Sequence, residues 1–163
     1  MPAKSAAILL SSLVLTAGAP RTQQALQWRT VQVPRIGQVG FVATRPTGRG
    51  PFPTVVILHG SHGFAVEYLE LAHDLARGGV LAVAVCWFSG GAGEGRRFVT
   101  SLNCPAGTPA MPRADSDQAF ATIDSVIASV RTMPDSRDDH IALFGHSRGG
   151  GAVQNYMMRG GPS

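Results

Sequence analysis

Two patterns of hydrophobic and polar positions predict the strands of this chain: alternation of polar and apolar residues, and continuous apolar runs. Residues 28–33 and 38–44 alternate between polar and apolar positions, which is typical of strands with one buried face. Residues 54–59 and 80–87 are continuous apolar runs, as in strands that are buried on both faces. A short fifth strand is predicted over residues 140–145.

Apolar residues at helical spacing fill the segments after these strands. Helices are predicted over residues 64–76, 114–131 and 147–159. Residues 89–112 contain eight glycine or proline residues and show no period, so we expect a long loop there. Buried strands that alternate with amphipathic helices predict an α/β fold with a mostly parallel, doubly covered sheet. The first two strands are expected to form an antiparallel hairpin at one edge of this sheet.

The first 19 residues have the form of a secretory signal peptide. Lys4 is followed by an apolar run and by an A-x-A cleavage pattern at residues 17–19. We therefore assign residues 1–19 to a signal peptide and residues 20–163 to a single domain, and we expect export to the periplasm or outside the cell. Pro20 disfavours cleavage, so anchoring in the membrane by an uncleaved signal is the alternative. No membrane span is expected after signal removal.

Charge and cysteine content narrow the expected partners. The formal net charge is +4, but the basic residues are scattered, so a nucleic-acid partner is not expected. Cys86 and Cys104 are separated by 18 positions. In an exported protein they could form a disulfide that contributes about 3 kcal/mol, or they could remain two unpaired cysteines. His59 and His62 have no further ligands nearby in the sequence, so neither a metal nor a cofactor is expected.

A G-x-S-x-G pattern directly follows the last predicted strand and opens the last predicted helix. It consists of Gly145, His146, Ser147, Arg148 and Gly149. In this context the pattern forms a strand-to-helix elbow that exposes a nucleophilic serine, here Ser147. The simpler alternative is a glycine-rich helix start in which Ser147 only caps the helix.

A second glycine-containing segment follows the first continuous apolar strand. It consists of His59, Gly60, Ser61, His62 and Gly63. A serine that attacks an acyl group needs two N–H donors for the oxyanion that forms. We expect one donor to be the amide of Arg148 and the other to be the amide of Ser61, with His62 as the runner-up.

Together the two motifs resemble the α/β-hydrolase superfamily and, within it, the dienelactone-hydrolase-like group. Residues 50–60 resemble the entry to that group's oxyanion strand, and residues 142–150 resemble its elbow. The resemblance covers about residues 46–160, and it implies hydrolysis of an ester, thioester or lactone through an acyl-enzyme. Dienelactone hydrolases themselves use a cysteine nucleophile, so Ser147 favours an esterase-like relative that acts on a small ester.

The rest of a serine triad is not found in the expected order. In this superfamily an acid and then a histidine follow the serine, whereas no Asp, Glu or His follows Ser147. His146 is expected to point into the core, and nothing in the sequence places a carboxylate behind His62. We therefore expect a hydrolase fold that is truncated after the elbow and its helix, with the acid and base absent.

Two functional hypotheses follow from this incomplete triad. The first is a serine hydrolase-type protein that acts on a small ester and whose acid and base come from elsewhere, including another chain. The second is a catalytically inactive hydrolase-like fragment that binds a partner through its open sheet edge. That edge would be the apolar run 141–144, which also offers a surface for self-association.

Overall fold

A computed structural model describes residues 26–161, so the signal-peptide assignment for residues 1–19 lies outside the described part of the chain. Five strands form one sheet in the order β1-β2-β4-β3-β5. The strands are β1 (Arg29–Val33), β2 (Gly37–Thr44), β3 (Phe52–Leu58), β4 (Leu81–Cys86) and β5 (Ser136–Gly145). β3 pairs in parallel with both β4 and β5, whereas β2 pairs antiparallel with β1 and β4. The predicted α/β sheet with an antiparallel hairpin at one edge is therefore confirmed.

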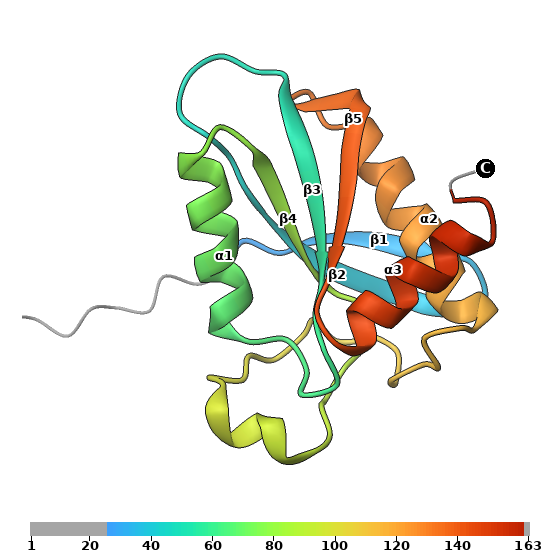
Figure 1. The fold of residues 1–163 in the computed structure, drawn as a ribbon. Helices are drawn as coiled ribbons and strands as arrows, with labels where there is room; N and C mark the ends of the chain where they lie inside the picture. The colour runs from blue at the N-terminus through green and yellow to red at the C-terminus, as the bar shows by residue number, and fades with distance from the viewer. Residues whose placement is uncertain (1–25, 162–163) are drawn as a thin grey trace, which may run out of the picture.

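Helices cover both faces of this sheet (Figure 1). They are α1 (Val66–Arg77), α2 (Asp117–Arg131) and α3 (Arg148–Met158), with a short 3-10 helix η1 (Glu94–Phe98) in the long loop. α1 packs on one face, and α2 and α3 pack on the other. Among residues 26–161, no helix is long and apolar enough to cross a membrane.

The continuous apolar runs form β4 and β3, two adjacent interior strands of the sheet. Every residue of β4 is buried, because β2 and β3 flank it and helices cover both of its faces. The three strands β4, β3 and β5 point the same way, so their carboxyl ends lie together at one end of the sheet. The loops that follow them, including residues 59–63 and 145–149, consequently lie together at that end of the sheet.

The observed starts of β5 and α2 differ from the predicted ones. β5 begins at Ser136 rather than at residue 140, because Ser136 pairs with Phe52 and the register shifts before Thr54. Charged residues are accommodated there because β5 is the edge strand. α2 begins at Asp117, where the hydroxyl of Ser116 accepts a hydrogen bond from a backbone N–H of the first turn.

Candidate functional site

Ser147 lies at the sharp turn between β5 and α3 and is exposed at the surface. Its backbone has φ 50° and ψ −112°, outside the regions that residues with a side chain normally adopt. Such a conformation costs about 1–3 kcal/mol and persists only where its surroundings hold it in place. Ser147 makes no side-chain capping hydrogen bond to α3, so the structure does not assign it the simpler role of a helix cap.

Two glycines allow the turn at Ser147 to close against the sheet. A Cβ atom on Gly145 would collide with the backbone of Gly149, and a Cβ atom on Gly149 would collide with the carbonyl of Leu58. The amide of His146 donates a hydrogen bond to that same carbonyl at 3.1 Å. The elbow is therefore packed tightly onto the carboxyl end of β3.

The loop after β3 lies directly beside the elbow. The guanidinium of Arg148 donates from Nε to Ser61 Oγ at 3.1 Å and from Nη1 to the carbonyl of Pro112 at 2.9 Å. The Ser61 carbonyl accepts a hydrogen bond from the amide of Ala92 at 2.7 Å. Within residues 26–161, neither the Ser61 amide nor the Arg148 amide has an acceptor. Both N–H groups are thus available, and the Arg148 amide lies in the first turn of α3, where the helix dipole favours negative charge.

His59 occupies a position that the sequence did not distinguish from the rest of its loop. The side chain is fully buried and its ring lies 4.3 Å from that of Phe88, centroid to centroid. Nδ1 lies 3.0 Å from the Gly60 carbonyl, which can only accept, so Nδ1 carries the proton. Desolvation lowers the pKa of His59 to about 4. His59 therefore supports the loop as a neutral core residue and is closed to substrate.

Tyr68 is part of the site, although sequence analysis assigned it only to an apolar helix face. Its hydroxyl accepts a hydrogen bond from the Gly60 amide at 2.9 Å. The same oxygen lies 2.8 Å from His62 Nε2 and 3.1 Å from His146 Nδ1. The signal that could have identified it is general: a tyrosine in an apolar stripe needs a partner for its hydroxyl.

His146 is oriented differently from the prediction. The side chain was expected to point into the core beside the elbow, but it is exposed and faces Tyr68 and His62. The reason is that β5 is the edge strand, so no further strand covers this side of the elbow in the described structure. The two imidazole rings lie 5.4 Å apart, centroid to centroid.

The surroundings of His62 and Tyr68 favour their uncharged forms. Desolvation lowers the pKa of His62, and the nearby His146 lowers it further, although the carboxylate of Glu67 acts in the opposite direction. Burial raises the pKa of Tyr68, so its hydroxyl stays protonated. The Glu67 carboxylate accepts from the Thr100 amide at 3.0 Å. Among the described residues, no carboxylate forms a hydrogen bond with His62 or His146.

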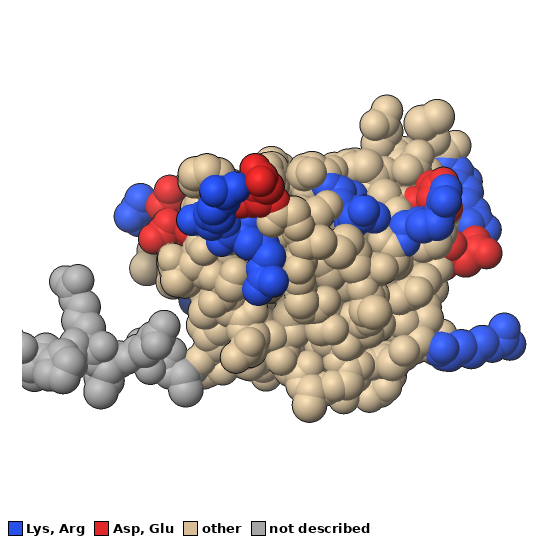
Figure 2. Space-filling model, turned by 90° about the horizontal axis from the view of Figure 1, so that it is seen from below, with Lys and Arg blue, Asp and Glu red and all other residues tan. Residues whose placement is uncertain are grey.

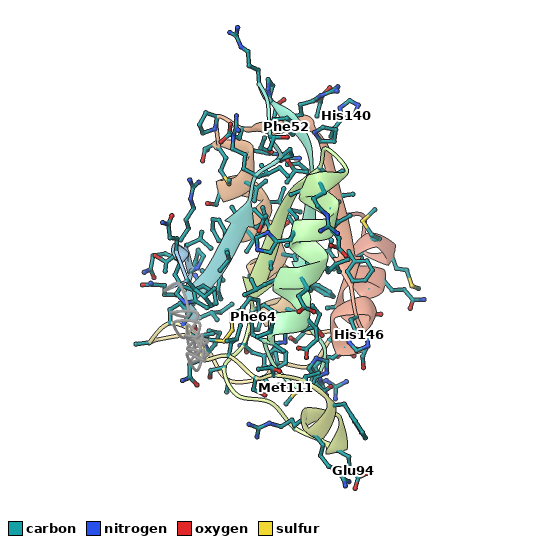
Figure 3. The ribbon with its side chains drawn as sticks, turned by 90° about the vertical axis from the view of Figure 1, so that its left-hand side faces the viewer. Phe52, Phe64, Glu94, Met111, His140 and His146 are labelled. Carbon is teal, nitrogen blue, oxygen red and sulfur yellow. A yellow bond between two sulfur atoms is a disulfide. The ribbon has the colours of Figure 1, made fainter. Side chains whose placement is uncertain are left out.

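The acidic residues of β5 lie far from the elbow. Figure 3 shows His140 and His146 toward opposite ends of this strand. Asp139 forms an ion pair with Arg137 and lies 2.8 Å from His140 Nδ1, at the end away from Ser147. No three His, Cys, Asp or Glu side chains in residues 26–161 are grouped to hold a metal ion.

The long loop after β4 lies beside the loop after β3 and borders the same end of the sheet. Cys86, at the end of β4, is joined by a disulfide to Cys104 in this loop, with their Cα atoms 5.9 Å apart. A hollow of about 270 Å³ lies between this loop, α1 and the end of β5. It is lined by His62 and His146 and by the apolar side chains of Leu71, Val99 and Phe144, among others. An exposed serine, two amides without an acceptor, two histidines and an apolar hollow that reaches His146 therefore lie at the same end of the described sheet.

Comparison with known proteins identifies similar structures but no sequence relatives. No family model matches the sequence, and no curated protein matches it. The structure of 2,6-dihydroxy-pseudo-oxynicotine hydrolase is similar with a TM-score of 0.59 and 19% identity, over 82% of this chain and 33% of that one. A candidate dienelactone hydrolase from Klebsiella pneumoniae is similar with a TM-score of 0.52 and 18% identity, over 75% of this chain and 50% of that one.

A third similar structure is XC6422 from Xanthomonas campestris, described as an α/β serine hydrolase without a lid. It has a TM-score of 0.53 and 16% identity, over 80% of this chain and 55% of that one. The chain thus spans between a third and about half of the length of these structures. At the level of the fold, the resemblance to α/β hydrolases and to the dienelactone-hydrolase-like group is confirmed.

Proposed function

We propose that this chain carries the nucleophile and oxyanion site of a serine hydrolase that acts on a small ester, thioester or lactone. The observation that carries the proposal is the backbone of Ser147, which holds a positive φ at a strand-to-helix turn. The structural neighbours are hydrolases, which supports the same class of reaction. Because the chain spans only part of the length of these structures, the activity of a whole hydrolase is part of this proposal.

The proposed reaction proceeds through an acyl-enzyme. Ser147 Oγ attacks the carbonyl carbon of the substrate, and the carbonyl oxygen becomes an oxyanion. The amides of Ser61 and Arg148 donate hydrogen bonds to that oxyanion. In acyl transfer, removal of one such donor lowers kcat by about 10²–10³-fold. The alcohol or thiol leaves with a proton, and water then releases the acid from Ser147.

The surface around the site supports an uncharged substrate. Acidic and basic side chains gather toward one margin of the end of the molecule that holds the loops after β3 and β5, and a broad uncharged surface lies beside them (Figure 2). The hollow beside His146 is lined mainly by apolar atoms of residues such as Leu71 and Phe144. Both features fit a small neutral acyl group better than a charged polymer.

The second candidate function is that of a catalytically inactive hydrolase-like fragment that binds a partner through the β5 edge. One observation favours it: within residues 26–161, no histidine beside Ser147 is hydrogen-bonded to a carboxylate, as a standard triad requires.

Labelling with a fluorophosphonate probe tests the proposal and separates the two candidates. We expect the wild-type chain to form one covalent adduct, located at Ser147 by mass spectrometry of peptides. Ser147→Ala should abolish the adduct, whereas Ser89→Ala, which removes another exposed serine in the loop after β4, should not change it. A wild-type chain that forms no adduct at Ser147 would contradict the proposal and favour the inactive fragment.

A further inference from the structure

The hydroxyl of Tyr68 has three partners, which use its whole capacity to donate and accept hydrogen bonds. A hydroxyl has one O–H to donate and two lone pairs that accept. The Gly60 amide can only donate, so it occupies one lone pair. One O–H and one lone pair remain for two nitrogens, Nε2 of His62 and Nδ1 of His146. One histidine must therefore accept from Tyr68 while the other donates to it.

This requirement links the tautomers of the two histidines. If Tyr68 donates to His62 Nε2, then His62 is protonated on Nδ1, and His146 must donate from its own Nδ1. If the direction is reversed, both rings are protonated on Nε2. The neutral histidines therefore share one tautomer in either arrangement. Each arrangement also leaves one basic nitrogen without a partner in the cluster, either Nε2 of His146 or Nδ1 of His62.

The same requirement limits the cluster to one added proton. A single proton on the free nitrogen preserves all three hydrogen bonds to Tyr68. A second proton would turn both histidines into donors, so three N–H groups would face two lone pairs and the O–H would lose its acceptor. Burial raises the pKa of Tyr68, so loss of its proton does not relieve this conflict.

The charged groups around the cluster do not compensate for a second proton. Glu67 on α1 is the acidic group that acts on His62 and Tyr68. Arg96 on η1 lines a second hollow next to His62, of about 280 Å³, and the guanidinium of Arg148 on α3 is held at Ser61, so the charged groups that these two elements bring near the cluster are positive. The neutral His59 lies beneath Tyr68, with 6.1 Å between ring centroids.

Gly60 is the residue that allows this cluster to form. A Cβ atom at Gly60 would lie 2.9 Å from His146 Nδ1 and 3.2 Å from His62 Cε1. Both rings therefore pack over a glycine, and any side chain there would push them away from Tyr68. The arrangement depends on contacts among three elements: the loop after β3, α1 and the elbow.

We propose that Tyr68 couples His62 and His146 into a unit that binds a single proton and accepts the proton of Ser147. The accepting role rests on the proposed function; the coupling does not. The chain has five histidines. His59 is buried, His140 lies at the far end of β5, and His73 is exposed on α1 and makes no contact with Tyr68. His62 and His146 are therefore the two candidates to accept the proton. His146 is bonded to Ser147 in the chain, and His62 follows Ser61, which contacts Arg148.

In the proposed step, the O–H bond of Ser147 breaks as the bond from Oγ to the carbonyl carbon forms. The proton moves to the free nitrogen of the coupled histidines, directly or through one water. It returns to the leaving oxygen or sulfur when the tetrahedral intermediate collapses. In this proton transfer Tyr68 acts only through its hydrogen bonds to His62 and His146, so it is a positioning residue.

Nuclear magnetic resonance of the imidazole nitrogens tests the coupling without any activity. We expect His62 and His146 to show the same tautomer above neutral pH and to take up one proton between them as the pH falls. Tyr68→Phe keeps the ring and removes the hydroxyl, so the two histidines should then titrate independently. Different tautomers in the wild-type chain, or uptake of two protons with unchanged curves in Tyr68→Phe, would overturn the coupling.

The pH dependence of fluorophosphonate labelling tests the accepting role. Tyr68→Phe should slow labelling of Ser147 by about tenfold or more and shift its pH profile. Tyr156→Phe is the matched control, because the Tyr156 hydroxyl contacts Asp124, away from the site. If Tyr68→Phe labels like the wild-type chain, the accepting role fails and the proposed function stands. If the wild-type chain is not labelled at Ser147, the proposed function and the accepting role both fail.

Discussion

Gly149 shows how a single missing side chain determines the shape of the site. A Cβ atom there would collide with the Leu58 carbonyl at the end of β3, which is backbone and cannot move aside. A Cβ atom on Gly151, two residues further along α3, would lie 3.5 Å from the Cβ atom of Ala114, which is an ordinary contact. The two glycines therefore differ in what a methyl group would meet.

We expect Gly149→Ala to lower the free energy of unfolding by about 1–3 kcal/mol, because it overpacks the contact between α3 and β3. Gly151→Ala should instead raise it by about 0.5–1 kcal/mol, since alanine is the better helix former. Chemical denaturation of the two variants and the wild-type chain measures both effects. Equal stability of the two variants would show that the close approach of Gly149 to Leu58 does not govern packing of α3.

His59 makes the stability of the molecule depend on pH. Its pKa is about 4 in the folded chain, below the ordinary value of 6.5, because burial opposes the charged form. The unfolded chain binds a proton between these values and the folded chain does not, so acid favours unfolding. Relative to a His59→Phe variant, the wild-type chain should lose up to about 3 kcal/mol as the pH falls from 6.5 to 4.

Denaturation at several pH values measures this loss as a difference in slope, which remains informative even if His59→Phe is less stable at every pH. Parallel stability curves for the two proteins would mean that the pKa of His59 is the same in the folded and the unfolded chain, which would contradict the prediction.

Sequence reasoning identified some site residues and missed the orientation of others. The motif G-x-S-x-G pointed to Ser147, and the observed positive φ is the backbone that such an elbow requires. Tyr68 and His146 were missed as partners, because a contact between α1 and the elbow joins positions 78 residues apart. Local periodicity carries no information on such a contact.

At the scale of the element, β5 is the strand with unfinished interactions. It lies at one end of the strand order, and its residues Ala142 and Phe144 are exposed, the latter at 44%. Met157 on the adjacent α3 is also exposed at 56%. Unpaired backbone groups beside apolar side chains favour addition of another strand.

We propose that two copies of the chain associate through their β5 edges. Ala142→Lys places a charge on this edge and should shift the protein to monomer, because a lysine on an edge strand opposes pairing. Thr30→Lys is the control, since Thr30 is exposed on β1 at the opposite edge of the sheet. Analytical ultracentrifugation measures the outcome; a monomeric wild-type chain, or equal association of both variants, would contradict the proposal.

At the scale of the whole molecule, the loops after three parallel strands converge on one end of the sheet. The disulfide between Cys86 and Cys104 fixes the long loop to this end, and the guanidinium of Arg148 ties the elbow to Ser61 and Pro112. A disulfide is in keeping with the export that we propose from residues 1–19. The proposed hydrolase function therefore depends on one compact group of loops.

The sequence by itself determined the order and type of the main elements, because continuous and periodic apolar patterns reflect local burial. It also determined which serine lies at the elbow, since the flanking glycines and the adjacent strand and helix are all local features. Only the tertiary structure decided that β5 begins at Ser136, that His59 is buried and that Tyr68 joins His62 to His146. Those outcomes depend on strand register and on contacts between distant segments, which no local pattern encodes.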